Sequence, residues 1–322
     1  MLAIKSESKD IYYNLAAEEF LLKQKDDELF MLWKSDPCVV VGKHQNAMAE
    51  INYRHLLAQK IPVARRLSGG GTVYHGPGNI NFTFIRNGEK GKLVDFRFFV
   101  TPVVNYLRGL GIGAKIGKRN DLLIGELKIS GNAEHVFKRR VLHHGTLLYN
   151  ANLDALNEAI RISKRRFIDK AVQSKRSKVT NIYDHLFDKL SCGEFEEGLF
   201  RYLSETFPDV VNYRFSAEEK EAIQSLIRDK YATSEWIFGY SPEFEMRNRI
   251  VLANHPSEIH CRVKNGIITD ISIYPSEKEF RQNLLNCLIG KRFDYNSVHA
   301  ELDAANTFST HVKHALLKAL FG

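Results

Sequence analysis

Three consecutive glycines, Gly69 to Gly71, constrain the fold of this chain more than any other feature, and they lie within RRLSGGGTVYHGPGNINFTF at residues 65–84. Glycine loses more conformational freedom on folding than any other residue, so such a run is favoured only where bare backbone is needed. The glycines lead into an alternating segment, residues 80–85, which predicts a half-buried strand. A Walker-type phosphate loop is excluded, because no Gly-Lys-Ser/Thr follows and the next element is a strand. Two interpretations remain open from the run alone: backbone N–H groups that surround an anion, or a glycine bulge at a sheet edge.

The length of 322 residues allows one large domain with a smaller one attached, or two domains of moderate size. Hydrophobic residues at 44% and charged residues at 26% are typical of a globular protein and exclude a disordered or fibrous one. The N-terminus has no signal-peptide pattern, and no apolar run approaches the roughly 20 residues of a membrane helix, so we expect a cytoplasmic protein without a membrane partner. The four cysteines, Cys38, Cys192, Cys261 and Cys287, lie far apart without a zinc-binding spacing, which predicts reduced and mostly buried thiols.

Positive charge is concentrated in one segment. Lysine and arginine number 46 against 38 aspartates and glutamates, and residues 161–178 contain eight of these bases with Asp169 as the one acid. Such a tract is equally compatible with a solvated surface and with a docking surface for an anionic partner. No aromatic residues are interleaved with the charges in the way that single-stranded nucleic acid requires, so nucleic acid is not an expected partner.

The hydrophobic pattern predicts an α+β fold, in which helices cover mixed or antiparallel sheets, because the strands cluster in hairpins. The expected helices are residues 15–23 with Asn14 as N-cap, residues 99–111 ending at Gly109 or Gly111, and residues 276–290 and 308–321. The expected strands are the pair 29–34 and 38–43, a hairpin at 121–130, a strand at 141–153 and a hairpin at 258–274 that turns at Asn265-Gly266. Residues 156–231, including the basic tract, are mostly helical by pattern. We expect a large catalytic domain at residues 1–246 and a small accessory domain at residues 247–322.

Two further segments contain polar residues in a suggestive arrangement. In KRNDLLIGELKISGNAEH, residues 118–135, alternation points Lys128 and Ser130 to one side of a strand and its apolar neighbours to the other. A lone strand lysine is more often solvated, and Asp121 is equally compatible with a plain turn residue. In VLHHGTLLYN, His143 and His144 face opposite sides of a strand, so a metal pair is not expected and a core or supporting histidine is the better interpretation.

Together, the three segments resemble the lipoate-protein ligase A family. The family's first motif contains Arg-Arg, Ser-Gly-Gly-Gly, His and Gly-Asn, and it is matched by RRLSGGGTVYHGPGNINFT. Its second motif contains Asn-Asp and Lys-Ile-Ser-Gly and is matched by RNDLLIGELKISGNA. Its third motif is matched by HHGTLL. The upstream NLAAEEFLL and CVVVGKHQNAMAEIN and the downstream SKRSKVTN and SEWIFGYSPEF also agree, so the resemblance covers nearly the whole chain. Two departures stand out: His135 occupies the place of an arginine of the enterobacterial type, and His75-Gly76-Pro77-Gly78 replaces the usual His-Asp-Leu-Gly.

The resemblance implies a two-step reaction, in which lipoate and ATP form lipoyl-AMP and the lipoyl group then passes to a lysine of a lipoyl domain. Lys128 is the expected catalytic cation between two anions, and Mg²⁺ is an expected cofactor with Asp121 as its candidate ligand. The resemblance also places the bare glycine backbone against the bound acyl-adenylate. The residues expected at the ATP and lipoyl-AMP site are Arg65, Arg66, Ser68, Gly70, Gly71, Thr72, Val73, Tyr74, His75, Asn81, Asn120, Asp121, Lys128, Ser130, Gly131, His144 and Thr146.

The implied partners are lipoate and the lipoyl domains of 2-oxoacid dehydrogenase acyltransferase subunits and of the glycine cleavage H protein. A lipoyl or octanoyl transferase is the nearest alternative, but it works through a nucleophilic cysteine, and no cysteine lies between Cys38 and Cys192. A biotin ligase is disfavoured because the Gly-Arg-Gly-Arg pattern is missing. Relatives that accept preformed lipoyl-AMP, and a non-catalytic module that binds lipoyl domains or nucleotides, are further alternatives.

Overall fold

The computed structural model describes residues 1–88, 95–118, 120–160, 166–252 and 255–322. Its largest unit is a six-stranded sheet in the order β10-β11-β6-β2-β1-β13. These strands are β1 (Leu2–Lys5), β2 (Leu29–Trp33), β6 (Asn79–Asn87), β10 (Asn132–Phe137), β11 (Arg140–Leu148) and β13 (Val211–Asn212). Strand β1 runs parallel to β2 and β13, and the other pairs are antiparallel. The sheet is therefore mixed, as the sequence predicts.

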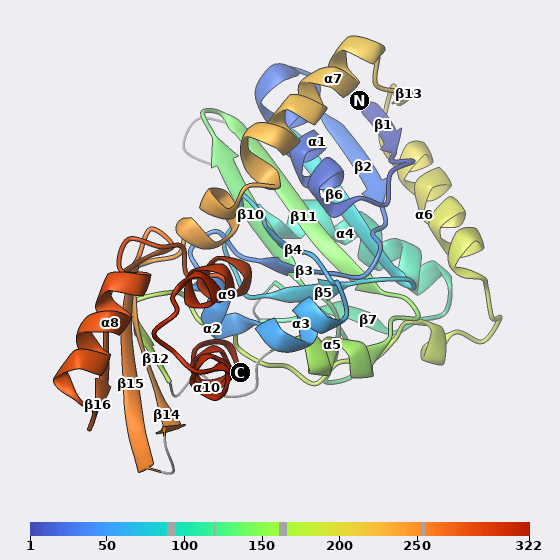
Figure 1. Cartoon of the computed structure of the whole chain (residues 1–322). Helices are drawn as coiled ribbons and strands as arrows, with labels where there is room; N and C mark the ends of the chain where they lie inside the picture. The colour runs from blue at the N-terminus through green and yellow to red at the C-terminus, as the bar shows by residue number, and fades with distance from the viewer. Residues whose placement is uncertain (89–94, 119, 161–165, 253–254) are drawn as a thin grey trace.

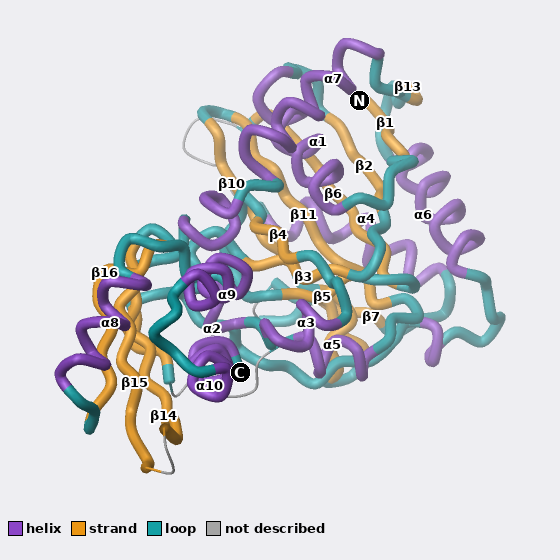
Figure 2. The backbone as a smooth tube through the Cα atoms, in the orientation of Figure 1, coloured by secondary structure: helices purple, strands orange, loops and turns teal. Residues whose placement is uncertain are grey.

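Helices cover both faces of this sheet (Figures 1 and 2). Along β2, Phe30 and Leu32 pack against α4 (Phe96–Gly109) and α6 (Cys192–Thr206). The alternate residues, Leu29 and Met31 among them, pack against α1 (Ile11–Gln24) and α7 (Ala217–Leu226). Residues Asn79 to Ile85 of β6 are consequently buried in succession, and the expected half-buried strand is a fully buried one.

Two small sheets flank the main sheet. One has the order β4-β3-β5, with β3 (Cys38–Val41), β4 (Val63–Arg65) and β5 (Val73–His75), and the other is β7 (Ala114–Ile116), β8 (Leu122–Ile124) and β9 (Leu127–Ser130). The expected pairing of residues 29–34 with residues 38–43 is wrong, because β2 pairs with β1 and β6 whereas β3 pairs with β4 and β5. The short connection favours a hairpin, but the paired partners come from distant parts of the chain.

The N-cap of α1 also differs from the expectation. Asp10 accepts a hydrogen bond from the Tyr12 backbone N–H at 2.8 Å, so the helix begins one turn before Asn14. Asn14 is buried inside the helix, where its amide donates to the carbonyls of Ser8 and Lys34. The helix at Phe96–Gly109, the β8–β9 hairpin and strand β11 are confirmed.

The C-terminal region contains a second core around a four-stranded sheet, β12-β14-β15-β16. Its elements are β12 (Phe167–Asp169), β14 (Phe244–Leu252), β15 (His255–Lys264), β16 (Ile267–Tyr274), α8 (Lys278–Leu288), α9 (Tyr295–Ala304) and α10 (Thr310–Phe321). The turn at Asn265-Gly266 is confirmed, and both residues have positive φ, at 52° and 74°. The core continues into α2 (Ala47–Glu50) and α3 (Tyr53–Ala58), whose Tyr53 ring lies 5.5 Å from that of Phe321.

The basic tract is not helical where the structure describes it. Residues 161–165 lie outside the described residues, β12 pairs with β14, and residues 170–178 are extended or irregular. The expected domain boundary between residues 246 and 247 falls within β14, and the division into two domains stays a prediction. The remaining elements are α5 (Leu153–Ala159), a 3-10 turn η1 (Tyr183–His185) and two π-helical turns, η2 (Ile227–Tyr231) and η3 (Glu235–Gly239). Among the described residues, no helix has the length and apolar character to cross a bilayer.

Candidate active site

A cavity of about 390 Å³ lies where the main sheet meets the two small sheets. Twelve residues of the expected site line it, namely Arg66, Gly70, Gly71, Thr72, Val73, His75, Asn81, Asp121, Lys128, Gly131, His144 and Thr146. The other five are not among its described lining residues, namely Arg65, Ser68, Tyr74, Asn120 and Ser130. The lining residues that the sequence analysis missed are Leu15, Trp33, Val40, Asn132, Ala133, Gly145, Val172, Gln173, Ser174, Lys175 and Ser177. Segments far apart in sequence thus form one polar cavity with an apolar part at Leu15, Trp33 and Val40.

Close packing and backbone conformation favour glycine at Gly42, Gly70 and Gly71, whereas a Cβ atom at Gly69 would meet no atom within 4 Å. A Cβ atom at Gly42 would lie 2.2 Å from the Gly70 carbonyl oxygen, and one at Gly71 would lie 3.0 Å from Ser174 Oγ. Gly70 also has a φ of +87°, which side-chain-bearing residues rarely adopt. Gly70 and Gly71 line the cavity as well, so bare backbone faces both the protein and the cavity.

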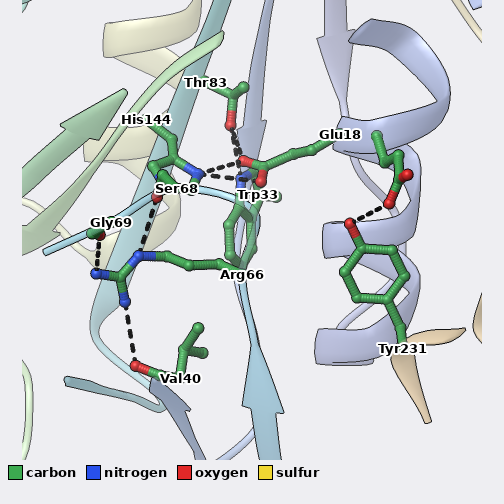
Figure 3. A network of polar contacts seen from close by, with 10 residues as sticks. Glu18, Trp33, Val40, Arg66, Ser68, Gly69, Thr83, His144 and Tyr231 are labelled. Carbon is green, nitrogen blue, oxygen red and sulfur yellow. Dashed lines mark hydrogen bonds and ion pairs between the residues drawn. The ribbon is translucent and has the colours of Figure 1, made fainter. Parts of the chain in front are cut away.

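Arg66 heads a hydrogen-bonded chain beside the cavity (Figure 3). Its Nη2 donates to the carbonyls of Gly69 and Gly71 at 2.6 and 2.7 Å, and its Nε donates to Ser68 Oγ at 3.0 Å. Ser68 Oγ lies 2.6 Å from His144 Nε2, and His144 Nδ1 lies 3.0 Å from both carboxylate oxygens of Glu18. Because Ser68 accepts from Arg66, its own proton points to His144 Nε2, and the imidazole donates from Nδ1 to Glu18.

Burial determines the protonation of this network. It lowers the pKa of Arg66 to about 10, although the charge of Glu18 acts in the opposite direction, so the guanidinium stays charged at neutral pH. Burial, with the charge of Arg66, lowers the pKa of His75 to about 3, so that imidazole is neutral. Glu18 was missed by the sequence analysis, although two adjacent acids within an otherwise apolar helix, AAEEFLL, were a usable signal.

Arg65 has a different position from Arg66. Arg65 is 0% exposed, and its guanidinium donates to carbonyls of the loop after β3 and of η3 and to the Ser241 hydroxyl. The carbonyls belong to Gly42, Lys43, Gln45, Trp236 and Ile237. Arg65, which was expected at the ATP and lipoyl-AMP site, is therefore not among the described residues that line the cavity. Successive residues at the end of β4 point to opposite sides, so one arginine reaches the cavity and the other joins the loop after β3 to η3.

Lys128 reaches the cavity from β9, whereas the next residue, Ile129, is fully buried in the core. A Cβ atom at Gly131 would lie 3.2 Å from Lys128 Nζ, so glycine leaves room for the ammonium group. Asp121, 6% exposed, precedes β8 and lines the same cavity. Ser130 is buried and lies 3.3 Å from the Asn132 amide that donates to it.

The segment after β12 closes one side of the cavity. Ser174 Oγ donates to Glu50 Oε2 at 2.5 Å and accepts from the Thr72 backbone N–H at 2.9 Å. Further along, the Lys128 N–H donates to the Lys178 carbonyl at 2.9 Å, which joins this segment to β9. These contacts replace the helix that the residue pattern predicted for this segment, because its backbone is paired with other parts of the chain.

His143 lies on the opposite side of β11 from His144, as expected. Its Nδ1 lies 2.9 Å from Glu134 Oε1, and its ring stacks on Phe82 and Phe99. Burial lowers the pKa of His143 to about 3 and, with the charge of Asp95, raises the pKa of Glu134 to about 7. No group of three or more metal-ligating side chains occurs within the described parts of the chain.

Comparison with known proteins identifies the family. Residues 10–204 match the lipoyl protein ligase A/B catalytic domain. The chain belongs to this family. It is 33% identical to a lipoate-protein ligase of Bacillus subtilis over 91% of this chain and 90% of the relative, and 33% identical to lipoate-protein ligase 1 of Staphylococcus aureus over 95% of each. The family resemblance inferred from the motifs is confirmed.

Solved structures confirm the fold class. A lipoate-protein ligase A bound with ATP superposes with a TM-score of 0.64 at 27% identity, over 74% of this chain and 98% of that chain. A ligase of Thermoplasma acidophilum with bound lipoic acid gives 0.63 at 28% identity, with the same coverage. A third structure, of a bipartite ligase and its E2 lipoyl domain from the same organism, gives 0.63 at 29%, over 74% of this chain and 96% of that chain.

Proposed function

We propose that this protein is a lipoate-protein ligase that activates lipoate with ATP and transfers the lipoyl group to a lysine of a lipoyl domain. The observation that supports this most directly is one cavity that combines Lys128, Asp121 and Arg66 with an apolar part at Leu15 and Trp33. Neighbouring structures contain lipoic acid or ATP, and the relatives are named as ligases. Because a fold alone does not imply a function, the ligase assignment rests on the chemistry of this cavity.

In the first step, a carboxylate oxygen of lipoate attacks the α-phosphorus of ATP. A P–O bond forms, the bond from the α-phosphorus to the bridging oxygen breaks, and pyrophosphate leaves with the electron pair. Two anions must approach, so a fixed cation in a water-poor site lowers the barrier most. Lys128 supplies that charge, and Arg66 holds the glycine loop in position beside it.

In the second step, the neutral ε-amine of the acceptor lysine attacks the acyl carbonyl of lipoyl-AMP. A C–N bond forms, the bond from the acyl carbon to the AMP oxygen breaks, AMP leaves with the electron pair, and the nitrogen loses one proton to water. The Gly70 and Gly71 backbone and Asn81 line the cavity in which this intermediate is held. The Asn81 amide nitrogen is buried without a hydrogen-bond partner among the described residues, so it can donate to an oxygen of the ligand.

Mg²⁺ fits the donor set at Asp121. Magnesium in nucleotide sites is commonly held by one or two carboxylates together with substrate phosphates, and Asp121 is the one carboxylate among the described lining residues. When bound, the ion screens the phosphate charges. Asp121 would hold it, while Lys128 acts from the opposite strand of the same hairpin.

The cysteines favour ligation over acyl transfer through a covalent enzyme intermediate. Cys38 is fully buried, and burial raises the pKa of its thiol to about 12, which disfavours the thiolate nucleophile. None of the described lining residues of the cavity is a cysteine. We therefore propose ATP-dependent activation. The proposed acceptors are lipoyl domains of 2-oxoacid dehydrogenase acyltransferase subunits or the glycine cleavage H protein, and the proposed compartment is the cytoplasm.

The test is modification of an unlipoylated lipoyl domain by the purified protein, followed by intact mass. We expect a mass gain of one lipoyl group on one lysine, dependent on both ATP and lipoate. Modification that needs supplied lipoyl-AMP or an acylated carrier protein, and that ATP with lipoate cannot replace, would instead establish a transferase.

A further inference from the structure

A group of basic side chains lies outside the cavity and next to its lining. We call Lys23, Lys43, His135 and Lys230 the basic rim. Lys23 Nζ and Lys230 Nζ both lie 2.6 Å from oxygens of Glu19, a carboxylate that is 3% exposed. Two lysines therefore share the charge of one acid, and the rim keeps an excess of positive charge.

Two aromatic side chains join the lysines into one surface. Lys230 Nζ lies 4.2 Å from the centre of the Trp236 ring, and the Trp236 and Tyr240 rings are 4.8 Å apart. Lys43 Nζ lies 6.0 Å from the centre of the Tyr240 ring, which is 42% exposed. Tyrosine and tryptophan are enriched among the residues that contribute most of the binding energy at protein interfaces.

The charges also influence one another across the rim. Burial lowers the pKa of His135, and the charges of Lys43, Lys23 and Lys230 lower it further, against the opposing effect of Glu19. The pKa of Lys230 is lowered by burial and by Lys23 and Lys43, whereas Glu19 raises it. The four side chains thus form one electrostatic unit, although they come from α1, the loop after β3, β10 and η2.

The rim lies next to the glycine loop that lines the cavity. The Lys43 backbone N–H donates to the Ser68 carbonyl at 2.9 Å, and Gly42 packs against Gly70, which lines the cavity. On β10, His135 lies on the same side of the strand as Ala133, another lining residue. None of the four rim residues is among the described lining residues, so they lie beside the nucleotide cavity rather than within it.

We propose that the basic rim, with Trp236 and Tyr240, is the docking surface for an acidic face of the acceptor domain. The inference rests on the proposed function, because the acceptor lysine must enter the cavity while its domain rests on the surrounding surface. A rim with excess positive charge favours a domain with carboxylates near the modified lysine and speeds their encounter. It also makes docking sensitive to salt.

The experiment compares the full-length wild type with Lys43→Glu, Lys43→Gln and Lys278→Glu. Lys43 is half-buried, and its ammonium group lies at the rim. Lys43→Gln removes the charge but keeps most of the aliphatic side chain, so it tests the charge even if Lys43→Glu impairs folding. Lys278 is an exposed lysine at the start of α8 and serves as the matched control. The probe is an unlipoylated lipoyl domain of an acyltransferase subunit, titrated at about 50 mM and about 300 mM NaCl.

We expect Lys43→Glu to raise the Kd for this domain about fivefold to tenfold at low salt, Lys43→Gln to raise it less, and Lys278→Glu to leave it unchanged. The difference shrinks at high salt. Pyrophosphate release from ATP and lipoate without acceptor stays within about twofold of wild type, because the cavity is intact.

An unchanged Kd in Lys43→Glu would overturn the proposal. A parallel fall in acceptor-free pyrophosphate release, with the Kd unchanged, would assign Lys43 to the ATP phosphates instead. Loss of binding to a single-stranded RNA, with unchanged binding of the domain, would make the rim a nucleic-acid surface. A wild type that binds the domain through Lys43 but neither releases pyrophosphate nor modifies the domain would refute the ligase function and leave the docking surface standing.

Discussion

The cavity region and the C-terminal region bury different kinds of side chain. Of the buried polar and charged residues in the described chain, all but Ser257 precede residue 247. They include Glu18, Arg66 and His144 beside the cavity. The C-terminal core contains apolar residues such as Ile271 and Leu316, both at most 1% exposed.

This difference separates function from stability. Buried polar groups cost free energy unless each is paired, whereas apolar packing stabilises directly. The cavity region satisfies its polar groups through chains such as Arg66, Ser68, His144 and Glu18. We infer that paired polar groups organise the first region, for chemistry at the cavity and for stability at sites such as Arg65, and that apolar packing organises the second, and the variants below test that comparison.

Lys128→Ala should have the largest effect on activity. It removes the cation that we propose acts on the α-phosphate, so lipoyl-AMP formation should fall about a thousandfold. The Lys128→Ala variant should unfold at the same urea concentration as wild type, because Lys128 reaches into a cavity rather than the core. Lipoyl-AMP formed from labelled ATP measures the first effect. A variant that makes the intermediate at the normal rate would refute the role of Lys128.

Arg65→Met should have the largest effect on stability. Five carbonyl groups that now accept from the guanidinium would be left without it, so the free energy of unfolding should fall by about 4 kcal/mol. Urea unfolding measures the loss, with the exposed Lys278→Met as control. A loss below about 1 kcal/mol would show that water or other donors replace the arginine.

Leu316→Ala should destabilise the C-terminal core without altering the chemistry. Deleting a fully buried leucine side chain costs about 3 kcal/mol through lost burial and the cavity left behind. The rate of lipoyl-AMP formation per folded molecule should match wild type. A reduced rate in fully folded protein would show that this region contributes to catalysis.

Glu18→Gln should lower activity while preserving or raising stability. The amide oxygen can still accept from His144 Nδ1, but the buried charge that orients the network is gone. We expect lipoyl-AMP formation to fall about tenfold and the free energy of unfolding to rise by up to about 1 kcal/mol. Parallel rate and unfolding measurements decide the point. Loss of both activity and stability would place Glu18 among the purely structural residues.

Glu134 should produce a smaller, pH-dependent effect. Its pKa rises from 4.5 in the unfolded chain to about 7 in the folded protein, so the folded state binds the proton more tightly. Stability from this group is present below about pH 4.5 and is lost as the pH rises to about 7. As the pH rises from 5 to 8, the free energy of unfolding of the wild type should fall by about 1 kcal/mol relative to that of Glu134→Gln. If the free energy of urea unfolding depended on pH equally in wild type and Glu134→Gln, the raised pKa of Glu134 would be contradicted.

Local patterns were sufficient for the parts of the fold that depend on near neighbours. The Asn265-Gly266 turn, the α4 helix and the 121–130 hairpin follow from turn chemistry and periodicity within a short window. Strands β2 and β3 were assigned to one sheet because they are adjacent in sequence. Their real partners are non-local, and pairing of that kind leaves no mark in a short stretch.

The candidate active site was also predictable only where its residues lie within local motifs. Lys128, Asp121 and the glycines lie within recognisable motifs, and the cavity brings them together. Strand alternation could have separated Arg65 from Arg66, but which of the two faces the cavity depends on loops far along the chain. Ser174 reaches the glycine loop through Glu50 and Thr72, and its charged surroundings suggested a solvated or helical segment instead.

The most direct test of the account is pyrophosphate release from ATP by the purified protein, with and without lipoate, in the absence of any acceptor. We expect release that requires lipoate and stops after about one turnover, because lipoyl-AMP remains in the cavity until a lysine arrives. No release with lipoate, while supplied lipoyl-AMP still modifies a lipoyl domain, would contradict it and move Lys128 from activation to transfer.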